Sequence, residues 1–280
     1  MARFLVLAVQ FTLPPMRIIA LFNQKGGVGK TTTTANLGAA LAESRRNVVL
    51  VDLDPQANLT THFGVDPPEI AVSTYRVLAD GLPLEEAFVA RGEYLRIAPS
   101  TTDLAAAEVE LVSVVGRELL LRRMADVRKF SADYVLIDCP PSLGLLTLNA
   151  LAWANEVIIP LQAHFLALQG MAKLFETCHL VRKQINPRLR ISGILLCQYE
   201  QQARLTGEVT DEVEKFLEAS RGKNEPWSEA VIFETHVRRN IKLAEAPSFG
   251  QSIFQYAPHS AGAADYSVLA EEIMKMEKKP

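Results

Sequence analysis

The amino-acid sequence predicts an α/β fold, with one domain built on a mostly parallel, twisted β-sheet and helices on both faces. Short apolar runs alternate with segments of helical periodicity along the chain, which is typical of βαβ units and parallel strands. A glycine-rich loop joins the first apolar run to the first helical segment. At 280 residues, 49% hydrophobic and 22% charged, the chain is long enough to bury one large core without dividing.

The expected strands are continuous apolar runs, as in parallel strands that are buried on both faces. The first two precede and follow the glycine-rich loop and its helix, at 16–22 and 47–52. Later strands are expected at 133–138, 156–160, 189–197 and 230–233.

The expected helices have alanine and leucine at helical spacing, and the first covers 32–44. The others are expected at 103–127, 144–153, 166–185, 205–219 and 262–277. A polar insert at 219–226 is interpreted as a surface loop.

The glycine-rich loop reads Q-K-G-G-V-G-K-T-T over residues 24–32. Its glycines let backbone N–H groups surround phosphate oxygens without a Cβ in the way, and the next helix adds its positive N-terminal end. In this pattern Lys30 fits the lysine that contacts the β- and γ-phosphates, and Thr31 fits the hydroxyl ligand of Mg²⁺. The cofactors expected are therefore ATP and Mg²⁺. The predicted ATP-binding residues of the loop are Lys25, Gly26, Gly27, Val28, Gly29, Lys30, Thr31 and Thr32.

The loop carries one lysine more than the usual G-x-x-x-x-G-K-[ST] pattern requires. That pattern would place glycine where this chain has Gln24, and Lys25 follows as a second cation. Since Lys30 already serves the nucleotide of its own subunit, Lys25 is available for another contact.

Acidic residues end two of the predicted strands, where α/β sheets place their ligands. Asp52 and Asp54 follow the strand at 47–52, and acids there can hold metal-bound waters and orient an attacking water. Asp138 ends the strand at 133–138 as a Walker B acid, which would bind Mg²⁺ through water or Thr31. Pro140 then stiffens the loop that follows.

Several motifs together resemble the ParA/MinD superfamily of P-loop NTPases. Residues 25–32 resemble its deviant Walker A loop, 52–56 its D-x-D-P-Q switch I, and 138–141 its D-x-P-P switch II. The segment 156–162 resembles the family strand that ends in P-L-Q. Residues 234–250 resemble the ParA/Soj segment that typically reads I-P-R-N-V-R-L-S-E-A-P-S, so the resemblance extends from Met16 to the C-terminal helix.

The resemblance implies roles for individual residues. Lys25 would cross an ATP-sandwich dimer interface to the partner's phosphates, Asp54 would be needed for hydrolysis, and Asp52 would support the Mg²⁺ shell. Lys25, Lys30 and Asp54 are therefore the predicted catalytic residues, and Thr31, Asp52 and Asp138 the metal site. Gln198, Val237 and Arg238 are the candidates for adenine contacts, although Arg238 stands where the family usually has proline.

The function implied is an ATP-dependent dimerising switch that binds double-stranded DNA without sequence preference and partitions chromosomes or plasmids. A ParB-like partner would accelerate an otherwise slow hydrolysis, in the cytoplasm and on the nucleoid. A net charge of −3 excludes a generally basic DNA-coating protein, so DNA binding needs a local cluster of cations. The predicted DNA-binding residues are Arg204, Arg238, Arg239 and Lys242. A second cluster, which is interpreted as a solvated helix end, comprises Arg182, Lys183, Arg188 and Arg190.

Three alternatives share this ATPase module: a MinD-like membrane-surface ATPase, a ParA-like ATPase that positions a protein cargo, and a small-molecule P-loop ligase. The tail 269–280 is short, mixed in charge and without aromatic residues, so no stable membrane association is expected. No substrate-pocket motif marks a ligase. The three cysteines form no C-x-x-C pair, which counts against an iron–sulfur relative.

The domain organisation expected is an ATPase domain at 16–280 preceded by an extension at 1–15. The extension is apolar but too short to span a bilayer, which takes about 20 apolar residues. We expect it to be disordered or to result from an upstream start codon, because the family's proteins usually begin near Met16.

Overall fold

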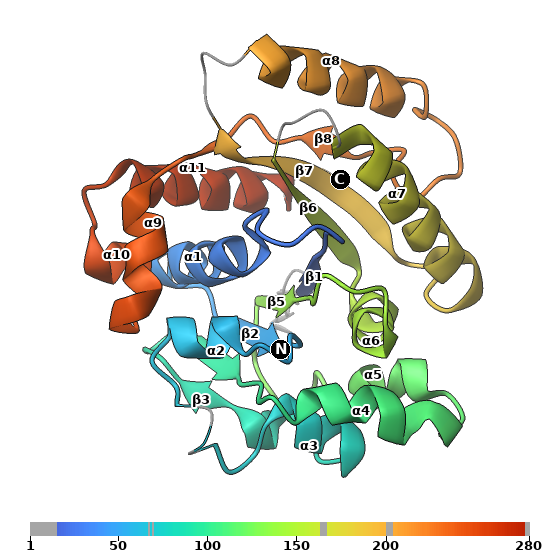
Figure 1. The fold of residues 1–280 in the computed structure, drawn as a ribbon, viewed down its shortest axis with the longest axis vertical. Helices are drawn as coiled ribbons and strands as arrows, with labels where there is room; N and C mark the ends of the chain where they lie inside the picture. Colours follow the sequence, from blue (N-terminus) through green and yellow to red (C-terminus); the bar gives the residue numbers. More distant parts are fainter. Residues whose placement is uncertain (1–15, 67, 69, 163–166, 200–203, 278–280) are drawn as a thin grey trace, which may run out of the picture.

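A computed structural model describes residues 16–66, 68, 70–162, 167–199 and 204–277 (Figure 1). The predicted extension, residues 1–15, lies outside them. The described strands are β1 Arg17–Leu21, β2 Val48–Asp52, β3 Val89–Ala90, β4 Leu95–Ala98, β5 Tyr134–Asp138, β6 Glu156–Gln162, β7 Arg190–Tyr199, β8 Val231–Ile232 and β9 Val237–Arg238. The described α-helices are α1 Lys30–Glu43, α2 Asn58–His62, α3 Thr74–Ala79, α4 Leu104–Glu110, α5 Leu120–Met124, α6 Leu145–Trp153, α7 Ala167–Gln184, α8 Arg204–Glu218, α9 Ile241–Glu245, α10 Ile253–Tyr256 and α11 Ala261–Met276. Short 3₁₀ turns lie between them, among them η5 Ala246–Phe249.

The sheet confirms the predicted fold class. Its strands run in the order β3-β4-β2-β5-β1-β6-β7-β8, and β9 pairs with β7 beyond the end of β8. All pairs are parallel except β3 with β4 at one edge. The three central strands β2, β5 and β1 are buried along their whole length.

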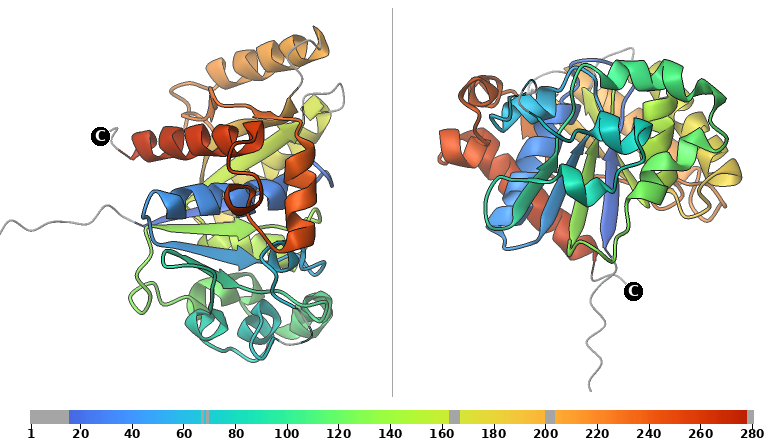
Figure 2. Two further views of the ribbon diagram at one scale, coloured as in Figure 1. Left: turned by 90° about the vertical axis from the view of Figure 1, so that its left-hand side faces the viewer. Right: turned by 90° about the horizontal axis from the view of Figure 1, so that it is seen from below.

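Helices cover both faces of the sheet, so alternate residues of a strand enter two separate apolar layers. Ile19 and Leu21 of β1 pack with α1 and α11, which run side by side on one face (Figure 2). Ile18 and Ala20 belong to the layer formed with α6 and α7 on the other face. The two layers fix the register of β1, because a slip of one residue would exchange its two faces.

The prediction of one continuous helix over 103–127 is wrong. The segment contains the short helices α4 and α5, separated by 3₁₀ turns. Val114 has extended backbone dihedrals (φ −80°, ψ 122°), and Gly116 has φ +71°, which no α-helix allows. The strands β3, β4 and β9 and the helices α2, α3, α9 and α10 were not predicted from the sequence.

The remaining predicted elements are present within a few residues of their expected bounds. Residues 219–226 form turns with mostly exposed side chains, as predicted for a surface loop. Among the described residues, no helix is long and apolar enough to cross a membrane.

Candidate active site

The glycine-rich loop lies between the end of β1 and the start of α1, at the centre of the sheet. Gly27 and Gly29 have φ values of +75° and +95°, which side chains with a Cβ rarely adopt. Gly29 is the N-cap of α1, so the unpaired N–H groups of the first helical turn point toward the loop. An ideal Cβ built on Gly26 or Gly27 would meet nothing within 4 Å, so space is open beside these two residues.

The two lysines of the loop occupy different environments. Lys30 is buried, and its Nζ donates to the carbonyl oxygen of Lys25 over 3.1 Å. Burial lowers the pKa of the Lys30 ammonium, while the charges of Asp138, Cys139 and Asp54 act in the opposite direction. Lys25 is exposed, and its backbone N–H donates to the side chain of Asn23.

Asp138 lies at the end of β5, in register with Leu21 of β1 and Asp52 of β2. Its Oδ2 accepts a hydrogen bond from the Thr31 hydroxyl over 2.7 Å. The carboxyl is fully buried, and this burial, together with the charge of Asp52, holds its pKa well above the usual range. The buried carboxyl groups of Asp138 and Asp52 lie on neighbouring strands, so it is unfavourable for both to be ionised at once. A cation bound beside them would offset this repulsion.

Asp52 and Asp54 are arranged differently from each other. The Asp52 carboxylate is fully buried and accepts hydrogen bonds from the N–H of Asp54 (3.1 Å), the N–H of Thr60 (2.9 Å) and the hydroxyl of Thr60 (2.7 Å). Burial raises the pKa of Asp52 to about 6, while the bonds from Thr60 act to lower it. Asp54 accepts the N–H of Gln56 through Oδ1 over 3.0 Å.

Gln198 contacts the glycine-rich loop directly. Its Nε2 donates to the carbonyl oxygen of Gly27 over 2.8 Å, and its Oε1 accepts from Gln162 over 3.0 Å. The residue has φ +53°, a left-handed conformation that directs the end of β7 toward the loop.

The other two adenine candidates lie in β9. Val237 is buried. Arg238 forms an ion pair with Asp265 of α11, with 2.6 Å between Nη2 and Oδ1. Its backbone N–H donates to the other oxygen of the same carboxylate. The adenine contacts of these three residues remain a prediction.

The predicted DNA-binding residues lie in β9, between β9 and α9, in α9 and at the start of α8. Arg239 and Lys242 are exposed close to Arg238, and Lys242 pairs with Glu245 over 2.8 Å. Arg204 is the first residue of α8, and its side chain lies outside the part of the chain that the structure describes. Because Arg238 and Lys242 are each paired with a carboxylate, part of the cluster's positive charge is offset.

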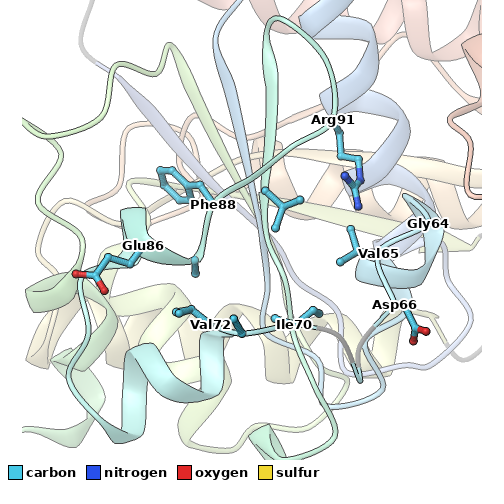
Figure 3. A pocket seen from close by; sticks show the side chains of 11 residues that line it. Gly64, Val65, Asp66, Ile70, Val72, Glu86, Phe88 and Arg91 are labelled. Carbon is cyan, nitrogen blue, oxygen red and sulfur yellow. The ribbon is translucent and has the colours of Figure 1, made fainter.

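A cavity of about 370 Å³ lies at the β3 edge of the sheet (Figure 3). Val65, Val72 and Phe88 line it together with Arg91. None of the predicted site residues is among its lining residues, so it is separate from the phosphate loop.

Sequence reasoning missed two residues that hold the site together. Thr60 holds Asp52, and the side chain of Asn23 joins the loop to the Pro160 carbonyl over 2.7 Å. Neither residue is part of a sequence motif with a known role. Both contacts join segments that come together only when the chain folds.

The comparisons with known proteins agree with this geometry. The AAA domain family AAA_31 matches residues 16–191. The chain is 43% identical over 258 residues to the sporulation initiation inhibitor protein Soj of Bacillus subtilis, covering 92% of this chain and 98% of Soj. It is 42% identical to the chromosome partitioning protein ParA of Myxococcus xanthus, covering 93% and 89% of the two chains.

The chain belongs to the ParA/Soj family of P-loop ATPases.

Two solved structures share the fold of this ParA/Soj family member. Cobyrinic acid a,c-diamide synthase from Mycobacterium smegmatis with bound ADP and magnesium is 35% identical, with a TM-score of 0.78 over 95% of this chain and 96% of that one. The septum site-determining protein MinD from Pyrococcus horikoshii, complexed with Mg-ADP, is 26% identical, with a TM-score of 0.73 over 94% and 98% of the two chains.

The family member is thus an ATPase with ATP and Mg²⁺ as cofactors. The residues present fit both groups, because the positive-φ glycines leave a backbone cradle and the Thr31 hydroxyl lies against a buried carboxylate. Bound Mg²⁺ would neutralise charge on the phosphates. Lys30, Thr31 and Asp138 would hold the phosphates and the metal.

Proposed function

We propose that this chain is an ATP-dependent dimerising switch that binds DNA without sequence preference and drives chromosome or plasmid partition. The observation that carries the proposal is the division between the two loop lysines. Lys30 is buried, and its ammonium group donates to a backbone carbonyl of the same loop. Lys25 is exposed at the surface of that loop. An exposed cation beside the phosphates suits a contact with the nucleotide of a second subunit.

Hydrolysis is proposed to depend on Asp54, which would position water for attack on the γ-phosphate. Asp54 is 8% exposed at the carboxyl end of the central strands, close enough to Lys30 to influence its pKa. The motifs offer no arginine finger, so turnover by the protein alone should be slow. A ParB-like partner would accelerate it and release the dimer.

DNA binding is proposed to follow from dimerisation. Each subunit would contribute Arg204, Arg238, Arg239 and Lys242, and two such clusters on one duplex would neutralise twice as many phosphates. On this proposal DNA binding requires ATP, and the ATP-bound protein is located on the nucleoid within the cytoplasm.

Replacing Arg239 tests the DNA surface most cleanly, because Arg239 is exposed and lies outside the phosphate loop. We expect Arg239→Glu to weaken binding to nonspecific duplex DNA by about tenfold or more at low salt, since two charges change in each subunit of the dimer. Binding is measured by fluorescence anisotropy with a labelled duplex in the presence of ATP.

The matched control is Arg188→Glu, the same change at another exposed arginine, in the cluster interpreted as a solvated helix end. Measured at the same salt concentration as Arg239→Glu, it should weaken DNA binding by much less, since a charge outside the proposed DNA surface contacts no phosphate. Equal losses in the two variants, or none in Arg239→Glu, would remove the proposed DNA surface.

One relative favours an alternative, because cobyrinic acid a,c-diamide synthase from Mycobacterium smegmatis shares this fold with 35% identity. A ligase of that kind would use ATP to join a carboxylate of its substrate to a nitrogen donor such as ammonia, forming an amide. ATPase activity that rises with cobyrinic acid and ignores DNA would favour the ligase. A MinD-like membrane-surface role and the positioning of a protein cargo are distinguished by which surface the ATP-bound protein binds.

A further inference from the structure

Thr60 is a fully buried residue of α2, the short helix that follows the switch I segment. Its hydroxyl donates to Asp52 Oδ2 over 2.7 Å and accepts the backbone N–H of Ser100 over 2.9 Å. With one donor and one acceptor contact, the orientation of the hydroxyl is determined. Thr60 therefore joins β2, α2 and the segment that follows β4.

The same carboxylate accepts backbone hydrogen bonds at both ends of the segment 54–60, which begins in switch I and ends in α2. Asp52 Oδ2 accepts the Thr60 N–H over 2.9 Å, and Oδ1 accepts the Asp54 N–H over 3.1 Å. The segment between them turns at Ala57, a non-glycine residue with φ +52°. Ala57 is 2% exposed, and its N–H donates to the Asp54 carbonyl. The backbone of Asp54 is thus held by hydrogen bonds to Asp52 and Ala57, and Thr60 binds the same Asp52 carboxylate at the other end of the segment.

We propose that Thr60 is a positioning residue for ATP hydrolysis, acting through Asp52 to hold Asp54 in place. The inference rests on the role proposed above for Asp54. Without the Thr60 hydroxyl, the buried Asp52 carboxylate loses a charge-assisted donor and Ser100 loses its acceptor, so the segment between them gains alternative positions. ATP affinity is set mainly by the glycine-rich loop and changes little.

The test compares Thr60→Val, which replaces the hydroxyl with a methyl group of similar size, with Thr60→Ser, which keeps the hydroxyl and removes the methyl group. Because a hydrogen bond to a charged group is lost, we expect kcat of Thr60→Val to fall about 10- to 100-fold while ATP affinity stays within about threefold. Thr60→Ser should restore most of kcat. Rates are measured by phosphate release and affinity with a fluorescent ATP analogue.

Thr61→Val is the matched control. Thr61 is the next residue of α2 and is exposed, and its hydroxyl donates to the carbonyl oxygen of Ala57, the N-cap of the same helix, over 3.0 Å. The two valine variants carry the same change in helix propensity, so a difference between them reports the contacts of the Thr60 hydroxyl. Thr61→Val should keep kcat within about twofold.

A second readout needs neither a variant nor a nucleotide. In the nucleotide-free wild type, the amide hydrogens of Asp54 and Thr60 should exchange slowly with solvent deuterium in site-resolved NMR, because both donate to a buried carboxylate. Rapid exchange of the Asp54 amide would overturn the proposal, even if Thr60→Val failed to fold.

Normal kcat in folded Thr60→Val would also overturn it, as would equal losses in Thr60→Val and Thr60→Ser. The Asp54→Ala variant separates this inference from the role it rests on. If Asp54→Ala hydrolyses ATP normally, the proposed role of Asp54 fails. If Asp54→Ala is inactive and Thr60→Val is not, only the positioning role of Thr60 fails.

Discussion

At the residue scale, the site concentrates buried charge at the carboxyl ends of three neighbouring strands. Asp138 and Asp52 end β5 and β2, and Lys30 begins the helix that follows β1. Burial disfavours the charged form of each of the three groups. It therefore raises the pKa values of the two aspartates and lowers the pKa of the lysine. A ligand that brings both a phosphate and a metal cation would stabilise the charged forms of all three groups.

The two lysines of the loop give a matched pair of substitutions. Lys30→Ala should weaken ATP binding by about 100-fold or more, because a desolvated cation at the phosphates is lost. Lys25→Ala, the same change at an exposed position five residues earlier in the loop, should leave the affinity of the monomer within about threefold. Titration with a fluorescent ATP analogue measures both, and unchanged affinity in Lys30→Ala would refute its role.

A buried histidine predicts part of the pH dependence of stability. His62 is 1% exposed, and burial lowers its pKa from 6.5 to about 4, although a hydrogen bond to the Gln251 backbone opposes this. The unfolded chain takes up this proton below pH 6.5 and the native protein only near pH 4. The free energy of unfolding should therefore fall as the pH falls across this window, by up to about 3 kcal/mol from His62 alone.

Urea unfolding of the wild type and of His62→Gln between pH 7 and pH 4 measures this contribution. The variant should lose less stability over the window than the wild type, because it has no proton to take up on unfolding. His259→Gln, at an exposed histidine, should keep the steeper dependence of the wild type. Parallel curves for the wild type and His62→Gln would contradict the assignment.

The site residues that the sequence predicted are those whose motif also fixes their local backbone. In the structure the Thr31 hydroxyl donates to Asp138 and the Lys30 ammonium donates to the Lys25 carbonyl, while the roles of these residues stay predictions. Thr60 was not predicted because its contact with Asp52 depends on the left-handed turn at Ala57. An alanine in the sequence gives no indication of such a turn. The ion pair of Arg238 with Asp265 joins distant segments and could not be predicted from the sequence.

At the element scale, the predicted strands and long helices formed because each has a continuous apolar run or an apolar face to bury. The two-residue strands β3 and β9 carry no periodicity of that length, so only their tertiary pairing defines them. The predicted helix at 103–127 failed for a local reason, since Gly116 requires a positive φ in the middle of it.

The contact between the end of α2 and η5 depends on two facing glycines. Gly250 has φ +66°, and a Cβ added there would lie 2.9 Å from the Cα of Gly64. Gly250→Ala should lower the free energy of unfolding by about 2–4 kcal/mol, because strain in φ and a backbone clash add. Gly222→Ala is the control: its φ is +72° but nothing lies within 4 Å, so it should cost only about 1 kcal/mol. Equal urea midpoints for Gly250→Ala and Gly222→Ala would show that the added Cβ at residue 250 does not clash with Gly64.

At the scale of the whole molecule, the proposed switch requires two copies of the chain to close over two nucleotides. Lys25 lies exposed at the central loop, and Arg239 and Lys242 lie exposed on the segment from β9 to α9. A dimer that formed through the loop would therefore present two copies of the basic segment. Dimerisation and DNA binding should rise and fall together with the nucleotide state.

The measurement that tests this claim most directly is analytical ultracentrifugation of Asp54→Ala with ATP or ADP, with and without nonspecific duplex DNA. The variant should bind ATP without hydrolysing it, so we expect a dimer with ATP that sediments with the DNA, and a monomer with ADP that does not. Lys25→Ala in the same background should remain monomeric with ATP. A monomer of Asp54→Ala under both nucleotides, or a dimer that forms equally well without Lys25, would contradict the account.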